Sequence, residues 1–296
     1  MATTAERSGA DLREPASWRR TKNRIAIGAM VLAAVVMAIP LGFVVWTVIS
    51  KGAAIISWSF LTSDIPPSIL PAGVGGMGPA VLGTLEITAL ATLMAVPLGV
   101  LGAIYLNEYG NRGLLARIVR TMSDVMTGVP SIVMGLFIFS IWVLHFGFSG
   151  LAGAFALGCL MLPVVIRSSE EMLRLVPDPL REASYALGAT KARVTLTVVL
   201  PAAVGGIVSG SLLAVARAAG ETAPLLFTIL TVTAPNTNLF SGANTALSAQ
   251  IFVNASSPYP GAQARAWGAA LTLIVIAFVL MIAARIITAR FTKHAR

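Results

Sequence analysis

Charged residues are scarce in this sequence. Asp, Glu, Lys and Arg make up 11% of the 296 residues, against about 25% in a typical soluble domain. Hydrophobic residues make up 56%, and the mean hydropathy is +0.84. This composition excludes an ordinary soluble globular protein and indicates an integral membrane protein.

Residues that build catalytic and metal sites are also scarce. The sequence has one cysteine and two histidines, so no His or Cys cluster has metal-site spacing, and we interpret Cys159 as a small apolar filler. It has no G-x-x-x-x-G-K-S/T loop to bind nucleotide phosphates and no G-x-S-x-G nucleophile motif. We therefore predict no catalytic residue, no metal ligand and no ATP hydrolysis by this chain alone.

Acidic residues are fewer than basic ones, with 12 Asp and Glu against 21 Lys and Arg and a net charge of +9. A nucleic-acid partner would require basic residues gathered on one solvated face. Here they lie between apolar runs, which excludes that partner and makes their placement a signal of membrane orientation.

Six apolar stretches are long enough to cross a membrane, since a spanning helix needs about 20 mostly apolar residues. They are residues 25–49, 79–105, 125–145, 150–167, 200–230 and 267–288. The sequence thus predicts an all-α polytopic membrane protein with six transmembrane helices. Several stretches contain proline, which is typical of transporters and channels because neighbouring helices or a wet cavity must satisfy the freed backbone groups.

The basic residues orient these helices. All of the 21 Lys and Arg except Lys51, Arg217 and Arg265 fall at chain ends or loops on one side. By the positive-inside rule both termini are cytoplasmic, as is the loop between the fourth and fifth spans.

Arg217 and Glu221 are ionisable residues inside the predicted fifth span. An ionised side chain near a helix centre costs about 2.5–3.5 kcal/mol or more, so it is normally paired or faces a wet cavity. A spacing of four residues allows the two to pair. One interpretation is a structural ion pair. The other is that the pair lines the route of an oxyanion: the forked guanidinium of Arg217 binds the anion, and Glu221 keeps that binding from becoming too tight for release. Glu86, in the second span, is a third candidate for this route.

The loop before the fifth span contains the sequence REASYALGATKARVTLTVVLP, residues 181–201. Asp178 and Pro179 predict a capped helix start, and Gly188 predicts its end. A second short helix should follow from about Thr190 toward Leu200. Two short helices joined at a glycine would project as a knob suited to docking on another protein; we disfavour a DNA-reading helix-turn-helix, because both ends are tethered to the bilayer.

This loop resembles the EAA loop of ABC importer permeases. The matching positions are Glu182, Ala183, Gly188, Leu200 and Pro201, while Ser184 departs from the second alanine of the pattern. The resemblance implies that the loop is a coupling helix that seats on a cytoplasmic ATPase subunit. It also implies an ABC transporter type-1 (MetI-like) permease bundle.

The sequence Arg217-Ala218-Ala219-Gly220-Glu221-Thr222-Ala223-Pro224-Leu225 is similar to the signature of phosphate importer permeases of the PstA type. The resemblance implies inorganic phosphate as substrate and an inner-membrane location, with ATP and Mg bound by the partner ATPase and no cofactor in this chain. It further implies a heterodimer with a second permease subunit of the PstC type, two ATPase copies and an external phosphate-binding protein, with membrane lipid around the bundle.

The predicted organisation follows from these observations. It comprises a cytoplasmic tail (1–24), a first transmembrane helix (25–50), an external loop (51–77), a permease core (78–288) with its coupling loop (170–201), and a cytoplasmic tail (289–296). We expect Gly206 and Gly210 to pack helices closely. We interpret the outward stretches, residues 51–78 and 231–266, as solvated linkers, part of which docks the binding protein.

Three alternatives are weighed against this function. A permease for another oxyanion, such as sulfate or molybdate, would share the loop and the Arg217 and Glu221 pair. An ion-coupled secondary transporter would need no ATPase, but usually shows inverted repeats, of which the sequence has no convincing trace. A receptor or scaffold would not need the intramembrane pair.

Overall fold

The computed structural model describes residues 16–110 and 113–293. All regular elements in these ranges are helical, which confirms the predicted all-α class. Residues 1–15 of the predicted N-terminal tail and 294–296 of the C-terminal tail lie outside the described residues.

The chain divides into two units, Met1–Ile49 and Ser50–Arg296. The first contains most of helix α1 (Ala16–Gly52), in which Trp18–Gly52 is long and apolar enough to cross a membrane. The helix therefore begins inside the predicted tail, because neither Gly nor Pro separates Ala16 from the apolar run.

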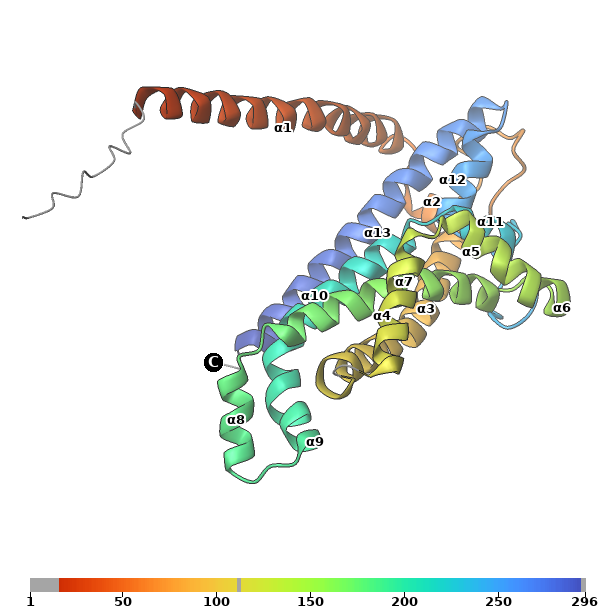
Figure 1. The fold of residues 1–296 in the computed structure, drawn as a ribbon. Helices are drawn as coiled ribbons and strands as arrows, with labels where there is room; N and C mark the ends of the chain where they lie inside the picture. Colours follow the sequence, from red (N-terminus) through yellow and green to blue (C-terminus); the bar gives the residue numbers. More distant parts are fainter. Residues whose placement is uncertain (1–15, 111–112, 294–296) are drawn as a thin grey trace, which may run out of the picture. The chain divides into compact units, whose positions relative to one another are not determined.

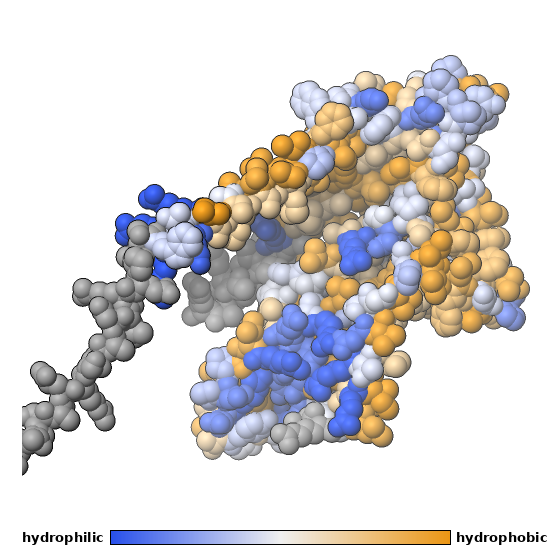
Figure 2. Space-filling view, turned by 45° about the horizontal axis from the view of Figure 1, so that its top comes forward, coloured by the Kyte–Doolittle hydropathy of each residue, from blue (hydrophilic) through white to orange (hydrophobic). Residues whose placement is uncertain are grey.

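The second unit is a bundle of helices (Figure 1). Its elements are α2 (Trp58–Thr62), α3 (Gly78–Ile104), η1 (Tyr105–Tyr109), α4 (Leu114–Gly128), α5 (Ser131–Ile138), η2 (Phe139–Val143), α6 (Leu144–Phe146), α7 (Gly150–Arg174), α8 (Asp178–Ala186), α9 (Lys191–Val194), η3 (Thr195–Val199), α10 (Leu200–Ala219), α11 (Ala223–Thr228), α12 (Leu247–Ala255) and α13 (Pro260–Lys293), where η marks a π-helical turn. Hydrophilic side chains gather at the lower end of this unit, and apolar ones cover much of its middle (Figure 2). This distribution fits a body whose apolar middle is surrounded by lipid and whose lower end in Figure 2 is in water.

The predicted third span, residues 125–145, is not one helix. It is divided between α4 and the helical run Ser131–Phe146, and the chain bends by 108° between the two. Pro130 disfavours the helical conformation at the residue before it, and Val129 is extended, with φ −70° and ψ 127°. Among residues 16–110 and 113–293, five helices could cross a membrane by length and composition, and six if this bent pair counts as one span.

The predicted fifth span, residues 200–230, begins and ends too late. Helix runs without a break from Lys191 through α9, η3 and α10 to Ala219. The second short helix predicted after Gly188 is therefore the start of this span, and Pro201 lies inside it just after a π-helical turn. The helix ends at Ala219 because Gly220 and Pro224 follow, and proline cannot continue a helix.

The other predicted ends shift outward. Helix α7 continues past residue 167 to Arg174, and helix α13 begins at Pro260 and continues to Lys293. The predicted coupling loop, 170–201, is thus shorter than expected, because helices take up both of its ends.

The core lies where α3, α7 and α10 pack together. Ile87, Ala91, Leu157 and Met161 form its buried centre with residues of α11 and α12. Small residues allow close approach: a Cβ at Gly99 would lie 2.7 Å from Val165 Cγ1 of α7.

Gly206 and Gly210 of α10 face the same helix. A Cβ at Gly206 would overlap Met172, and one at Gly210 would lie 2.5 Å from Ser168 Oγ. This geometry suits the predicted packing role, which stays a prediction.

The outward stretches are folded, contrary to the expectation of solvated linkers. In residues 231–266, α12 is largely buried, and Gln250 donates hydrogen bonds to Thr245 Oγ1 at 3.0 Å and to the Val232 carbonyl at 3.3 Å. Arg265, with 0% exposure, donates to the carbonyls of Leu70 at 3.0 Å and Pro71 at 2.9 Å. These bonds satisfy buried polar groups and fix residues 67–71 against α13.

Gly83 marks where α3 meets the segment before α12. A Cβ there would overlap the Thr245 carbonyl oxygen, a backbone atom that cannot rotate away. We expect Gly83→Ala to lower the free energy of unfolding by about 1–3 kcal/mol through overpacking. Gly158→Ala is the matched control, because its Cβ would meet its nearest atom, the Ala91 carbonyl oxygen, at 3.9 Å. Thermal unfolding of both variants in detergent tests this, and equal stability of the two would contradict it.

Candidate functional site

The predicted knob contains one separate short helix, α8, and its second helix is the start of the long run Lys191–Ala219. Its helix α8 ends before Gly188, whose φ of +78° is the left-handed conformation that glycine adopts readily. The predicted capping by Asp178 is wrong: Pro177 is the N-cap residue, and Asp178 instead accepts a hydrogen bond from Arg181 Nη1 at 3.1 Å.

The outer surface of this knob is exposed. Helix α8 buries none of its residues; Leu180 is 47% exposed and Leu187 is 89% exposed. Glu182, Ala183 and Gly188 are exposed beside them, whereas Leu200 lies further along, partly buried in the helix of the fifth span. Two exposed leucines, one on this polar helix and one just after its end, form a surface suited to a partner protein.

Arg181 fixes the knob to the bundle from its inner side. Its Nη2 donates to Glu108 Oε1 of η1 at 3.0 Å and to the Leu173 carbonyl at 3.0 Å, and its Nη1 donates to the Val176 carbonyl. The side chains of Arg181 and Glu108 are 14% and 5% exposed. The pair therefore joins the base of α8 to the end of the second span.

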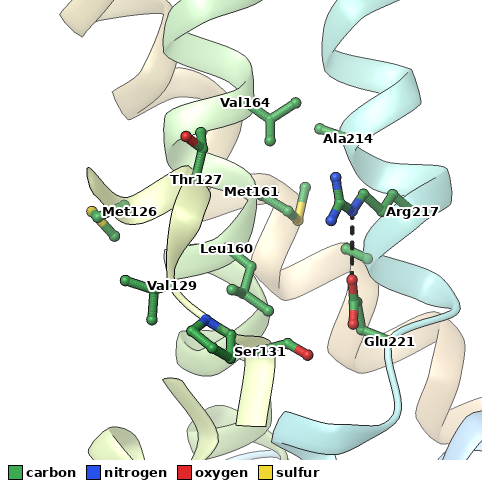
Figure 3. Close-up of a pocket in the computed structure, with 12 residues that line it drawn as sticks. Met126, Thr127, Val129, Ser131, Leu160, Met161, Val164, Ala214, Arg217 and Glu221 are labelled. Carbon is green, nitrogen blue, oxygen red and sulfur yellow. Dashed lines mark ion pairs between the residues drawn. The ribbon is translucent and has the colours of Figure 1, made fainter. Parts of the chain in front are cut away.

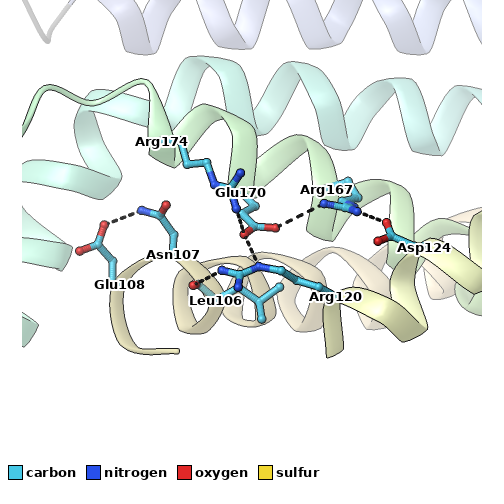
Figure 4. A network of polar contacts seen from close by, with 8 residues as sticks. All are labelled: Leu106, Asn107, Glu108, Arg120, Asp124, Arg167, Glu170 and Arg174. Atoms are coloured by element: carbon cyan, nitrogen blue, oxygen red, sulfur yellow. Dashed lines mark hydrogen bonds and ion pairs between the residues drawn. The ribbon is translucent and has the colours of Figure 1, made fainter. Parts of the chain in front are cut away.

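A second charged cluster lies on α7 near the same end. Glu170 Oε1 accepts from Arg120 Nε at 2.9 Å and Arg174 Nη2 at 2.7 Å, while Arg167 Nη1 lies 4.0 Å from Oε2 (Figure 4). The Glu170 side chain is 2% exposed. One buried carboxylate thus connects α4 with the end of α7.

Arg217 and Glu221 lie at the end of α10, where the helix stops. Arg217 is in its last turn, and Glu221 is in the turn that follows, not inside a span as predicted. Arg217 Nε lies 3.5 Å from Glu221 Oε1, so the predicted pair forms.

This pair lines a cavity of about 250 Å³ between α10, α7 and the α4–α5 break. Figure 3 shows Arg217 and Glu221 on one side of the cavity and Thr127 and Ser131 on the other. Leu160, Met161 and Val164 of α7 supply an apolar wall. The Arg217 side chain is 73% exposed, so the cavity is open to the surface of this chain. The arrangement places one permanent cation, its paired carboxylate and two hydroxyl groups around a space that fits a small anion.

The third candidate, Glu86, is elsewhere. It is half-buried on α3, is not among the residues lining the Arg217 cavity, and forms no ion pair with Arg217. Its role in a pathway stays a prediction.

Sequence reasoning missed Thr127, Ser131, Glu108 and Glu170. The first two flank Pro130, so the proline that breaks the span was a usable signal. The sequence also contained a signal for Glu170, because Arg167 and Arg174 stand three and four residues away on the same helical face. In the described part of the chain, no group of three or more His, Cys, Asp or Glu residues could hold a metal ion.

Residues 95–293 match the family model of the binding-protein-dependent transport system inner membrane component. The chain belongs to this family. Its members are membrane subunits of transport systems, so the broken spans and the exposed knob lie in an inner-membrane permease.

Curated relatives of this permease carry more specific names. This chain is 43% identical over 281 residues to the phosphate transport system permease protein PstA 1 of Mycobacterium tuberculosis, and the match covers 94% of this chain and 91% of the relative. It is 42% identical over 303 residues to the PstA protein of Yersinia pestis, covering 99% of this chain and 100% of the relative.

Solved structures confirm the fold of the permease. A bacterial alginate ABC transporter superposes with a TM-score of 0.61 at 15% identity, covering 93% of this chain and 98% of the other. The inward-facing MetNI methionine ABC transporter gives 0.56 at 20% identity, covering 73% and 97%. The MetI-like bundle predicted from the EAA-like loop is thus confirmed.

Proposed function

We infer that this chain is the membrane-spanning permease subunit of an ABC importer for inorganic phosphate, with Arg217 on the route of the anion. The observation that carries the role of Arg217 is its pairing with Glu221 at the mouth of the cavity. The phosphate-transport names of relatives above 40% identity support the substrate.

The chemistry of the cavity suits transient binding. The guanidinium of Arg217 is permanently charged and donates from a planar fork that matches phosphate oxygens. Glu221 is 3.5 Å from that fork and competes for it, which keeps the anion from binding too tightly to leave. The hydroxyl group of Ser131 can replace water around the anion as it passes, whereas that of Thr127 would first have to leave the Asp124 carbonyl, to which it donates at 2.7 Å.

A second membrane subunit is part of this proposal. The 73% exposure of Arg217 would leave the anion route open to lipid in a single chain, where a charge is costly. A related permease of the PstC type, packed over the open side, would close it. The heterodimer would then alternate between inward-open and outward-open states.

The energy would come from outside this chain. We propose that the transporter has two copies of a cytoplasmic ATPase, which bind ATP and Mg, and that one of them docks on the α8 knob through Glu182 and its exposed neighbours, so that both termini and the knob face the cytoplasm. An external phosphate-binding protein would deliver substrate at the α12 end. This chain would contribute the route and the coupling but no catalytic step.

Substitution of Arg217 tests the anion route. We expect Arg217→Gln to lower ATP-dependent phosphate uptake by reconstituted vesicles about tenfold, because it removes a charge-assisted hydrogen bond of about 1.5 kcal/mol or more. Arg217→Lys keeps the charge but loses the fork, so we expect an intermediate rate. Arg285→Gln, which removes an exposed positive charge from α13, is the control.

The outcome also separates the alternatives. Normal uptake by an assembled Arg217→Gln complex would reduce the pair to a structural ion pair. Competition by sulfate or molybdate, but not by phosphate, would indicate another oxyanion. Uptake that follows an ion gradient without ATP would indicate a secondary transporter.

A further inference from the structure

The turn that carries Glu221 is held locally through the amide of Glu221, which donates to the Ala218 carbonyl at 3.1 Å, but not through its carbonyl. Helix α10 ends at Ala219, and helix α11 begins at Ala223. In a continuous helix the amide of Leu225 would donate to the carbonyl of Glu221. It donates to the Thr222 carbonyl instead, at 3.1 Å. The carbonyl of Glu221 therefore lacks its usual helical donor and can accept a hydrogen bond from another element.

Ser248 supplies such a contact. Its hydroxyl donates to the Glu221 carbonyl at 3.0 Å across 27 residues of sequence. Ser248 is 3% exposed and lies in the first turn of α12. Glu221 is thus held at three points: its amide donates to the Ala218 carbonyl, its carbonyl accepts from Ser248, and its carboxylate lies 3.5 Å from Arg217 Nε.

Helix α12 is itself firmly placed. The amide of Leu247 donates to Thr84 Oγ1 of α3 at 2.8 Å. Further along, Asn254 Nδ2 donates to Gln250 Oε1 at 3.0 Å, and Gln250 Nε2 reaches Thr245 Oγ1 at 3.0 Å. All of these residues except Thr84 follow the Arg217–Glu221 turn in sequence. These hydrogen bonds hold α12 in place, so the Ser248 hydroxyl donates to the Glu221 carbonyl from a fixed position.

We propose that Ser248 is a positioning residue for the anion route: by fixing the Glu221 carbonyl, it sets where the Glu221 carboxylate stands and how strongly it competes for Arg217. This rests on the proposed function, which gives Arg217 and Glu221 their task. Ser248 does not line the cavity and would not touch the anion. Its effect passes through Glu221 alone.

Ser248→Ala is the direct test. In vesicles containing the whole transporter and a phosphate-loaded binding protein, we expect the maximal uptake rate per assembled complex to fall about fivefold, the usual effect of one lost hydrogen bond. The concentration of loaded binding protein that gives half-maximal uptake should stay unchanged. A purely structural role would change the amount of complex and leave the rate per complex as in the wild type.

Ser211 provides the matched control. It is a buried serine of α10, 4% exposed, and its hydroxyl has no hydrogen-bond partner in the described structure. We expect Ser211→Ala to transport at the wild-type rate. Equal losses in the two variants would overturn the proposal, as would wild-type transport by Ser248→Ala.

A double-mutant cycle shows whether Ser248 acts through Glu221. If it does, adding Ser248→Ala to Glu221→Gln should change uptake little further, because the carboxylate it positions is already gone. A full fivefold loss in that background would contradict the proposal. Failure of the anion route itself would appear differently, as normal uptake by Arg217→Gln.

Discussion

Replacement of Glu170 by alanine is expected to lower the free energy of unfolding of this permease by about 3 kcal/mol. The carboxylate is 2% exposed and accepts from Arg120 at 2.9 Å and Arg174 at 2.7 Å. Removing it leaves two guanidinium groups beside each other without their shared anion. The estimate is at the low end of the range for a broken buried ion pair, because the arginines are 28% and 55% exposed and water can solvate them in part.

The neighbouring Glu171 makes a sharp control, because it differs from Glu170 mainly in being exposed. Glu171→Ala should change stability by less than about 0.5 kcal/mol. Thermal unfolding in detergent at two salt concentrations measures both variants. The loss at Glu170 should persist at high salt, since buried pairs are weakly screened. If Glu170→Ala were as stable as Glu171→Ala, the cluster would be dispensable to the fold.

The spans were predictable because their signal is local. A helix in lipid must be apolar over about 20 residues whatever packs around it, so hydropathy alone located the helices now seen as α1, α3, α7, α10 and α13. Their ends were less predictable. Arg167 and Lys191 look like loop residues by charge, yet the helices that contain them extend beyond the apolar part.

The breaks were harder to place than the helices. Pro130 and Pro224 were visible in the sequence, but a proline in a span is compatible with a kinked helix, a broken span or the end of the helix. Packing decides among these. A Cβ at Gly135 of α5 would lie 2.7 Å from Pro224 Cα, so α5, which follows Pro130, and α11, which contains Pro224, approach each other closely. No local pattern encodes that contact.

The partners of the charged residues were predictable only at short range. Arg217 and Glu221 stand four residues apart, and this spacing predicted that they pair. Glu108 and Arg181 are 73 residues apart, Arg120 and Glu170 are 50 apart, and Glu221 and Ser248 are 27 apart. Such pairs depend on how whole helices pack, so a single sequence names the residues without joining them.

Arg181→Ala should uncouple the knob from the bundle. The substitution removes the cation from Glu108, which is 5% exposed, and the donors from the carbonyls of Leu173 and Val176. Leaving a buried carboxylate unpaired costs about 3 kcal/mol or more. This is enough to shift the equilibrium between attached and detached positions of α8 about a hundredfold toward the detached ones. We expect the transporter to bind its ATPase and hydrolyse ATP while phosphate uptake per ATP falls at least tenfold. Arg117→Ala, which removes an exposed arginine from α4, should transport normally.

Exchanging the two charges distinguishes this attachment from a simple ion pair. In a simple pair, Arg181→Glu combined with Glu108→Arg would restore coupling. Here it should not, because Arg181 also donates to two carbonyl oxygens, and a glutamate at that position would repel them. Arg181→Lys, which keeps a donor and the charge, should recover part of the uptake. Full recovery by the exchanged pair would show that charge alone holds the knob. Loss of ATPase binding in Arg181→Ala would instead place Arg181 with Glu182 on the docking surface.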